Sequence, residues 1–233
     1  MVKKKKIKLS DKAYELLKKD IVECFLVPGE IIEEAEVCAR HKIGHTPFRE
    51  ATARLNAEGW IDISPHRGYF AATISSTQIR DFFELRLMIE PRAAYMACSR
   101  ITAQGLALLE KNVEESIELA KLNDVPKSLR NSIDFHRLIA QLAGNKELAE
   151  LVETLHFKLV RAVIYSLKES VPPRPLNFRH QGILNAFKAK DPVLAQKEME
   201  GDLQDTIKML DLLQSVWTLP LETRKLDPKS KEK

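Results

Sequence analysis

The sequence predicts a mainly α-helical protein in two parts, with three helices and a β-hairpin first and an all-helical antiparallel bundle after them. Three observations support this fold class. Apolar residues recur at helical spacing through most of the chain. Two short runs typical of strands, residues 60–63 and 69–72, follow the first three helices. From residue 75 to about residue 217 the sequence has almost no strand pattern.

The second and third helices are predicted to form a helix-turn-helix, preceded by a longer first helix. The first helix ends before Pro28 and Gly29, and the second is short, around residues 35–39, with Gly44 in the turn that follows it. The apolar face of the first helix contains Ala13, Leu16, Leu17, Ile21, Cys24 and Phe25. Two helices joined by a tight turn are typical of DNA-binding proteins.

The third helix is the most informative segment of the chain. Thr46 is expected as its N-cap and Pro47 as its first helical residue. One face is apolar and contains Phe48, Ala51 and Leu55. The opposite face is expected to expose His45, Arg49 and Thr52. Arginine and threonine in this position suit the edges of bases in a DNA major groove, although an ordinary surface helix would show the same pattern.

The hairpin after the third helix carries two basic residues at its tip. Residues 64–68 form the turn between the two strand-like runs, and His66 and Arg67 lie at its centre. Such a tip could reach a minor groove or a phosphate, or could be a solvated structural turn. Three helices followed by a hairpin with a basic tip form a winged helix.

The second part is predicted to be a helical bundle. Its first helix begins with a capping box formed by Ser75 and Gln78, and a later one ends at Gly144. The expected helices lie at residues 75–93, 102–121, 126–143, 145–169, 176–189 and 192–214. Six helices with apolar stripes imply an antiparallel bundle.

We therefore expect four segments, which are a disordered basic tail (1–9), the winged helix (10–74), the helical domain (75–217) and a charged tail (218–233).

The composition limits the possible function classes. The net charge is only +4, so DNA affinity must come from local placement of charge. No apolar run is long enough to span a bilayer, and no signal peptide is visible. Three scattered cysteines without a CxxC pattern favour reduced core residues in a cytoplasmic protein.

The first part resembles the DNA-binding domain of the GntR family of bacterial transcription regulators. The resemblance rests on an ordered set of motifs, namely Pro28-Gly29-Glu30, Thr46 to Ala51, Arg54-Leu55, Glu58-Gly59 and Pro65-x-x-Gly68. It implies DNA contacts by Arg49 and, at similar positions, by Thr46, His66 and Gly68. The family usually has Ser-Arg where this chain has Gly44-His45, which alters the expected operator sequence.

The second part contains three marks, Glu84-Leu85-Arg86 with Glu90, Phe135-His136 followed by Gly144-Asn145, and His180-x-x-Ile183-Leu184 followed by Asp191. With these marks it resembles the effector-binding FCD domain of the FadR branch of the same family. Together the two resemblances cover roughly residues 10–215. They imply a homodimer that binds operator DNA and senses a small organic acid.

Many members of this branch bind a divalent metal through an aspartate and three histidines. At the corresponding positions this chain has Ser132, His136, His180 and Asp202. The resemblance therefore implies a set of His136, His180 and Asp202, which could hold Zn or Ni. Alternatively, both histidines are hydrogen-bonded inside the bundle without a metal. Asp134 lies on a different helix face from His136, and His156 is expected to be a core or interface residue.

Two arginines are candidates for the effector pocket. Arg86 could anchor an organic anion, or it could form an i,i+4 ion pair with Glu90. Arg161 is a weaker candidate for a polar group in the same pocket.

We interpret the chain as a ligand-responsive transcription regulator rather than an enzyme. One alternative is a metal-dependent enzyme that uses His136, His180 and Asp202 to activate water. The sequence offers no general base or oxyanion stabiliser beside that set, and this alternative leaves the winged helix unexplained. A second alternative is a winged helix that binds another protein, because Gly44-His45 replaces the usual Ser-Arg. The basic residues Arg49 and Arg67 argue against it.

Overall fold

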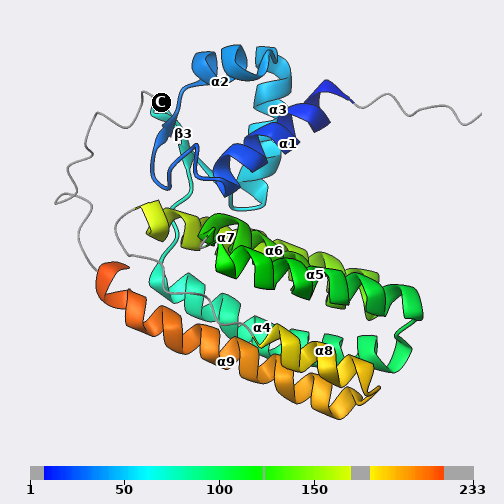
Figure 1. Ribbon diagram of the computed structural model, residues 1–233. Coiled ribbons are helices and arrows are strands. Elements are labelled where there is room, and N and C mark those ends of the chain that lie inside the picture. Colours follow the sequence, from blue (N-terminus) through cyan, green and yellow to red (C-terminus); the bar gives the residue numbers. More distant parts are fainter. Residues whose placement is uncertain (1–7, 123, 169–178, 218–233) are drawn as a thin grey trace, which may run out of the picture.

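A computed structural model of the protein describes residues 8–122, 124–168 and 179–217. Figure 1 shows a small domain with a β-sheet lying on a larger domain made only of helices. The predicted fold class, a winged helix followed by a helical bundle, is confirmed. The expected tails at 1–7 and 218–233 lie outside the described residues, whereas Leu9 already belongs to the first helix.

The small domain contains three helices and a three-stranded antiparallel sheet. The helices are α1 (Leu9–Val22), α2 (Glu34–His41) and α3 (His45–Ala57). The strands are β1 (Ile31–Ile32), β2 (Ile61–Ser64) and β3 (Gly68–Ala71), in the spatial order β1-β3-β2. The predicted hairpin is present, with Ser64 opposite Gly68 beside the turn. Strand β1 was not predicted, because two residues are too few to produce an alternating pattern.

Helix α3 begins two residues earlier than its sequence signals indicated. Its N-cap is Gly44, in an extended conformation without a side-chain cap bond, so the prediction of Thr46 as N-cap is wrong. Pro47 is therefore the third helical residue. This position tolerates proline because the first four N–H groups of a helix have no partner within it. The shift brings His45 into the exposed first turn of the helix.

The core of the small domain forms where α1 and α3 pack against the sheet. Its largest side chains are fully buried and comprise Leu17, Ile21, Phe48, Leu55, Trp60 and Ile61. All three cysteines, Cys24, Cys38 and Cys98, are buried, as predicted for the first two. Helix α3 is thereby held with one face in the core and the other toward solvent.

Among the residues that the structure describes, the large domain contains six helices. They are α4 (Ser76–Arg100), α5 (Ala103–Lys121), α6 (Val125–Leu142), α7 (Lys146–Lys168), α8 (His180–Lys188) and α9 (Pro192–Trp217). The predicted capping box at the start of α4 is confirmed, since Ser75 Oγ accepts a hydrogen bond from the Gln78 N–H at 3.1 Å. Gly144 follows the end of α6 with φ +70°, as expected for a terminating glycine. Part of the expected helix 176–189 lies outside the described residues.

The helices of the large domain form two layers. Helices α5, α6 and α7 lie nearer the small domain, and α4, α8 and α9 form the other layer (Figure 1). Phe157 of α7 packs against the core of the small domain, and Arg130 of α6 forms an ion pair with Glu23 at 3.2 Å. Within the part of the chain that the structure describes, no helix combines the length and apolar character needed to cross a membrane.

Candidate functional site

The outer face of α3 exposes three of the predicted DNA-binding residues, His45, Thr46 and Arg49. The side chain of Arg49 is 68% exposed, and its Nε lies 3.3 Å from the carboxylate of Glu34 on α2. The same carboxylate oxygen lies 2.7 Å from His45 Nδ1. Exposed ion pairs of this kind contribute little stability. A phosphate or a base edge could therefore replace Glu34 as the partner of Arg49.

Thr52 was predicted to lie on this outer face, and that prediction is wrong. Its side chain is completely buried, and its hydroxyl donates a hydrogen bond to the carbonyl of Arg49 at 3.1 Å. With 3.6 residues per turn, Thr52 lies only about 40° around the helix from Phe48. It therefore belongs to the apolar face and cannot contact DNA.

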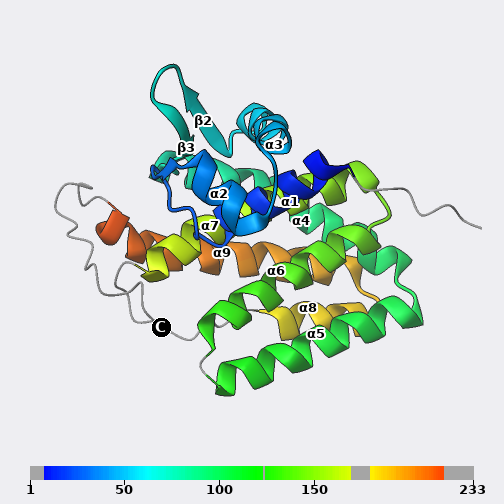
Figure 2. The same cartoon turned by 90° about the horizontal axis from the view of Figure 1, so that it is seen from above.

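The turn between β2 and β3 exposes His66, Arg67 and Gly68. Figure 2 shows this hairpin projecting beside α3. The backbone N–H of Arg67 donates to the carbonyl of Ser64 at 3.1 Å, and His66 and Gly68 both have positive φ angles. The Arg67 guanidinium lies 5.5 Å from the centre of the Phe70 ring. This tight turn places two basic side chains at the tip, and their contact with DNA stays a prediction.

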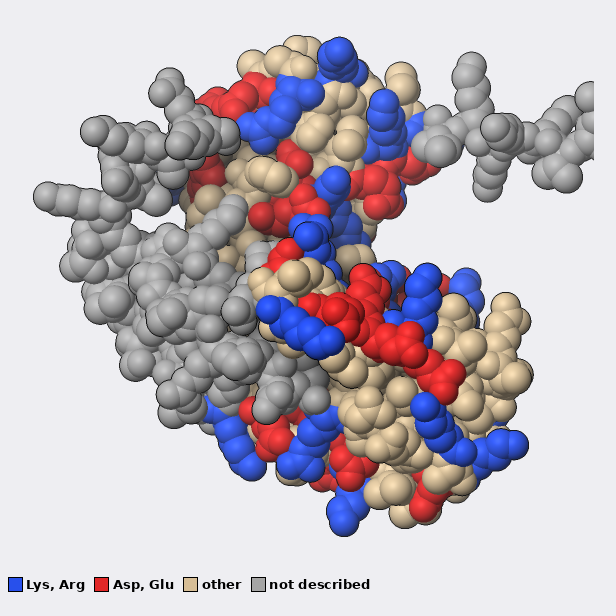
Figure 3. Space-filling view, in the orientation of Figure 1, with Lys and Arg blue, Asp and Glu red and all other residues tan. Residues whose placement is uncertain are grey.

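Acidic and basic side chains are interspersed over the face drawn in Figure 3, and they do not separate into one basic patch. This distribution agrees with the small net charge of +4. Any attraction to a phosphate backbone must therefore come from local groups such as those of α3 and the β2–β3 turn.

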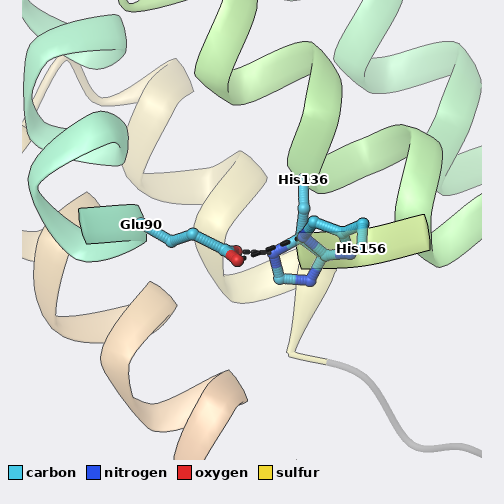
Figure 4. Close-up of side chains that lie close together, drawn as sticks. All are labelled: Glu90, His136 and His156. Carbon is cyan, nitrogen blue, oxygen red and sulfur yellow. Dashed lines mark hydrogen bonds and ion pairs between the residues drawn. The ribbon is translucent and has the colours of Figure 1, made fainter. Parts of the chain in front are cut away.

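A second candidate site lies inside the large domain, where five helices bring polar side chains together. All are buried, and they comprise Arg86 and Glu90 of α4, Ser132 and His136 of α6, His156 of α7, His180 of α8 and Asp202 of α9. Figure 4 shows Glu90, His136 and His156 pointing toward one another from three of these helices. We call these seven residues the buried cluster.

In one half of the buried cluster, Glu90 contacts Arg86, His136 and His156. One carboxylate oxygen accepts from Arg86 Nε at 2.5 Å and lies 3.1 Å from His156 Nε2, and the other lies 2.7 Å from His136 Nδ1. Burial would raise the pKa of Glu90, but the charge of Arg86 and the two histidines outweigh it and hold the pKa well below its usual value. The ion pair of Arg86 with Glu90, left open by the sequence, is present.

The other half of the cluster contains the residues that the family resemblance assigned to a metal. His136 Nε2 lies 3.3 Å from Asp202 Oδ2, while Asp202 Oδ1 accepts a hydrogen bond from the backbone N–H of Arg179 at 2.7 Å. Ser132 Oγ lies 3.5 Å from His180 Nε2. All four positions of the family's metal set therefore converge in this fold.

The three histidines of the cluster differ in their protonation. Burial, together with the neighbouring His136, lowers the pKa of His180 to about 3. Burial and the charge of Arg86 lower the pKa of His156 to about 4. Burial also acts to lower the pKa of His136, but Glu90 and hydrogen bonds to Asp202 and Glu90 outweigh it, and the pKa is raised. Neutral imidazoles, the form that binds metal, are therefore favoured at His156 and His180.

The geometry of His136, His180 and Asp202 fits a divalent metal. One ligand atom from each lies within 4.8 Å of the others. Ligands about 2.1 Å from a tetrahedral zinc lie roughly 3.4 Å apart, close to the observed distance between His136 and Asp202. The contact of His136 Nδ1 with Glu90 would then orient the imidazole, as carboxylates behind metal-bound histidines commonly do.

A second set, Glu90, His136 and His156, also lies within 4.8 Å but fits a metal less well. The charge of Glu90 is already balanced by Arg86. His156 is thus a buried, hydrogen-bonded residue, as its sequence context indicated. Asp134 is exposed and pairs with Arg137 at 3.1 Å, so it does not replace the missing aspartate.

Two features of the site differ from the sequence interpretation. The sequence pairs Glu90 only with Arg86, and no spacing along the chain indicates that Glu90 contacts His136 on α6 and His156 on α7. Arg161 was expected in the effector pocket, but it lines a cavity between the two domains together with Trp60 and Lys158. An effector role for Arg86 or Arg161 stays a prediction.

Two family models match the chain. The model described as "Bacterial regulatory proteins, gntR family" matches residues 9–70, and the model of the FCD domain matches residues 81–205. The two matches coincide with the small domain and with most of the helical domain. The helices that form the buried cluster therefore belong to the FCD match.

Relatives and solved structures agree with this division. The HTH-type transcriptional repressor RspR of Escherichia coli is 31% identical over 200 residues, which cover 84% of this chain and 86% of RspR. The transcriptional repressor NanR of Salmonella newport is 27% identical over 84% of this chain and 83% of NanR. The structure of E. coli McbR/YncC covers 90% of this chain and all of that chain with a TM-score of 0.79 at 21% identity, which shows the same fold.

Proposed function

The chain belongs to the GntR family of bacterial transcription regulators and carries an FCD domain, and from this premise we propose that it binds operator DNA as a homodimer whose affinity is set by a small organic acid. The observation that carries the proposal is the exposure of His45, Thr46 and Arg49 on α3 beside a hairpin with a basic tip. Donors on an exposed recognition helix can bond base edges, and the hairpin can reach the backbone or the minor groove.

The test of DNA recognition compares operator binding by the wild type and Arg49→Ala. The probe is the DNA upstream of the protein's own gene, and binding is measured by fluorescence anisotropy over a range of salt concentrations. If Arg49 reads a base, the variant loses about 1–3 kcal/mol of binding free energy on the specific site. Arg92→Ala is the matched control, because Arg92 is an exposed arginine of α4 in the large domain. Equal specific binding by wild type and Arg49→Ala would refute the role of Arg49.

The buried cluster supports an acidic effector in the helical domain. Arg86 and Glu90 balance each other, so a divalent metal on Asp202 and two neutral histidines would leave one positive charge in excess. A buried excess charge is unfavourable unless it is paired. The carboxylate of a small acid would neutralise it and complete the coordination of the metal. When bound, the metal would act as a Lewis acid that holds the carboxylate.

Helix α7 offers a direct connection between this cluster and the winged helix. His156 of α7 points inward to Glu90, and the next two residues, Phe157 and Lys158, point toward the small domain. Phe157 packs against the small domain's core, and Lys158 Nζ lies 5.8 Å from the Trp60 ring. A ligand that shifts α7 would therefore favour one placement of the DNA-binding domain over another.

A homodimer is supported by symmetry and by exposed apolar residues. Helix-turn-helix regulators bind two half-sites of a pseudo-palindrome as two-fold dimers. On α4, the side chains of Leu85 and Met88 are three residues apart and are 42% and 71% exposed. Exposed large apolar side chains on one helix face suit an interface.

Native mass spectrometry combined with elemental analysis tests assembly and ligands together. We expect the mass of a dimer, one equivalent of a divalent metal per chain and a co-purified small acid. A monomer at micromolar concentration would refute the dimer, and a metal-free, acid-free protein that also takes up no added zinc or nickel would refute the sensing site.

A further inference from the structure

A small cavity lies at the junction between the winged helix and the bundle, apart from the outer face of α3 and from the buried cluster. Its volume is about 30 Å³. It lies between Trp60 of the small domain, Thr73, Ile74 and Gln78 around the start of α4, and Lys158 and Arg161 of α7. The linker between the two domains therefore forms one of its walls.

Arg161 enters this cavity as a buried cation without sufficient partners. Its residue is 2% exposed, and its Nε and Nη2 atoms have no hydrogen-bond partner among the described residues. The hydrogen bond that Cys24 Sγ donates at 3.4 Å goes to the backbone carbonyl of Arg161 and does not involve the guanidinium. Burial lowers the pKa of Arg161 to about 10, with only partial compensation from Cys24 and Asp62. A buried guanidinium normally has a paired anion, because its desolvation is otherwise unfavourable.

Two further sources of positive potential point at the same space. Lys158 lies one helical turn before Arg161, and no described carboxylate comes within 4.0 Å of its ammonium group. Its Nζ lies over the rings of Trp60 and Phe82 at 5.8 and 5.5 Å. The cavity also borders the N-terminus of α4, a helix of 25 residues whose dipole is positive at this end.

We propose that this cavity is an anion-binding site, occupied by a monovalent anion of the size of chloride that bridges Arg161 and Lys158. The size follows from the volume, since a space of this kind holds one or two water-sized groups. Water could accept the hydrogen bonds of Arg161 but carries no net charge, whereas a monovalent anion accepts them and also neutralises one of the two positive charges. A phosphate group has too many atoms for the space.

A bound anion would join three elements from the two domains. Arg161 and Lys158 belong to α7, Gln78 to α4, and Trp60 to the segment that follows α3. The anion would therefore stabilise one placement of the winged helix on the bundle. This role is independent of DNA contacts by α3 and of any effector in the buried cluster.

The first test uses crystals of the full chain grown or soaked in sodium bromide, because bromide replaces chloride and gives an anomalous signal. We expect an anomalous peak within hydrogen-bond distance of the Arg161 guanidinium. No peak there at saturating bromide, with well-ordered Arg161 and Lys158, would overturn the proposal.

The second test measures thermal unfolding of the full chain as gluconate is replaced by chloride at constant ionic strength. We expect the melting temperature of the wild type to rise with chloride, and Arg161→Gln to lose this chloride-specific rise. Arg80→Gln, which changes an exposed arginine near the start of the same α4, should keep it. Equal chloride responses in the wild type and Arg161→Gln would overturn the proposal.

A third variant keeps the test decisive if Arg161→Gln does not fold. Lys158 is only partly buried, so Lys158→Gln should fold. The chloride concentration that gives half of the stabilisation should rise by about tenfold in this variant, because one charge-assisted contact with the anion is lost. An unchanged half-saturation in Lys158→Gln would contradict the bridging geometry.

Discussion

The outer face of α3 and the buried cluster are built in opposite ways. The outer face consists of His45, Thr46 and Arg49 of one helix, and their side chains are exposed. The buried cluster brings together seven residues from five helices, from Arg86 on α4 to Asp202 on α9, and all seven side chains are buried. A function carried by one helix is visible in the spacing of its residues. A site made by the meeting of several helices becomes visible only when their packing is known.

The two regions also differ in what their charges contribute. Arg49 and Glu34 form an ion pair near the surface, where such pairs are weak and can be exchanged. Arg86 and Glu90 form an ion pair with 6% and 2% exposed side chains, and the loss of one partner leaves an uncompensated charge in the interior. Substitutions on the outer face of α3 should therefore change DNA binding and leave stability intact, whereas substitutions in the buried cluster should change stability.

The largest effect is expected for Glu90→Gln. This variant keeps the shape of the side chain but leaves Arg86 without its counter-charge, so we expect a loss of about 3–5 kcal/mol in the free energy of unfolding. Urea denaturation followed by circular dichroism measures it. Glu84→Gln, on an exposed position of the same helix, is the control and should change stability by less than about 0.5 kcal/mol. A loss in Glu90→Gln as small as in the control would show that the cluster is hydrated and not part of the interior.

Metal addition should have the next largest effect. At a free concentration one hundred times the dissociation constant, zinc or nickel should raise the free energy of unfolding by about 2.7 kcal/mol, because the unfolded chain lacks the assembled site. Asp202→Asn should remove most of this rise by removing the only carboxylate of the set. Asp205→Asn, three residues further along α9, is the control and should keep it. An equal rise in both variants would place the metal elsewhere.

Local patterns in the sequence predicted the fold. The predictions that were missing or wrong concern short segments or single residues. Within the described residues, the predicted helices, the β2–β3 hairpin and the capping box of Ser75 are present. Strand β1 was too short to detect. The polar chemistry of Thr52 indicated an exposed position, but its place on the helix, about 40° from Phe48, puts it in the core.

The buried cluster was predictable only in part and only through the family resemblance. His136, His180 and Asp202 were named because their positions correspond to the family's metal ligands, and their spacing of more than 20 residues carries no geometric signal of its own. Glu90 and His156 could not be joined in advance, because their contact depends on how α4 packs against α7. For the same reason nothing indicated that Arg161 lies at the domain junction.

A smaller effect, of about 2 kcal/mol, is expected from pH through His156 in the metal-free protein. Its pKa is about 4 in the folded protein and near 6.5 in the unfolded chain, so the unfolded state takes up a proton that the folded state excludes. The stability that neutral His156 contributes is complete above pH 6.5 and is lost as the pH falls toward 4. The raised pKa of His136 acts in the opposite direction, with stability lost as pH rises, so a variant must separate the two.

His156→Gln isolates this contribution. Between pH 7 and pH 5 the wild type should lose about 2 kcal/mol more stability than His156→Gln, as measured by urea denaturation after removal of metal with a chelator. His66→Gln, which changes an exposed histidine of the wing, should lose as much as the wild type. If the pH dependence of His156→Gln equals that of the wild type, His156 is not held neutral in the interior.

The smallest effect, and the sharpest test of where the outer face of α3 ends, is expected for Thr52→Val. The side chain keeps its shape and burial but loses the hydroxyl that donates to Arg49, so stability should fall by about 1 kcal/mol and operator affinity should stay unchanged. Thr46→Val makes the same chemical change three positions from Arg49 on the exposed side, and it should weaken operator binding without loss of stability. Fluorescence anisotropy and urea denaturation of both variants separate the two effects. Were Thr52→Val to weaken operator binding while Thr46→Val did not, the helix would present to DNA the face that the structure packs against the core.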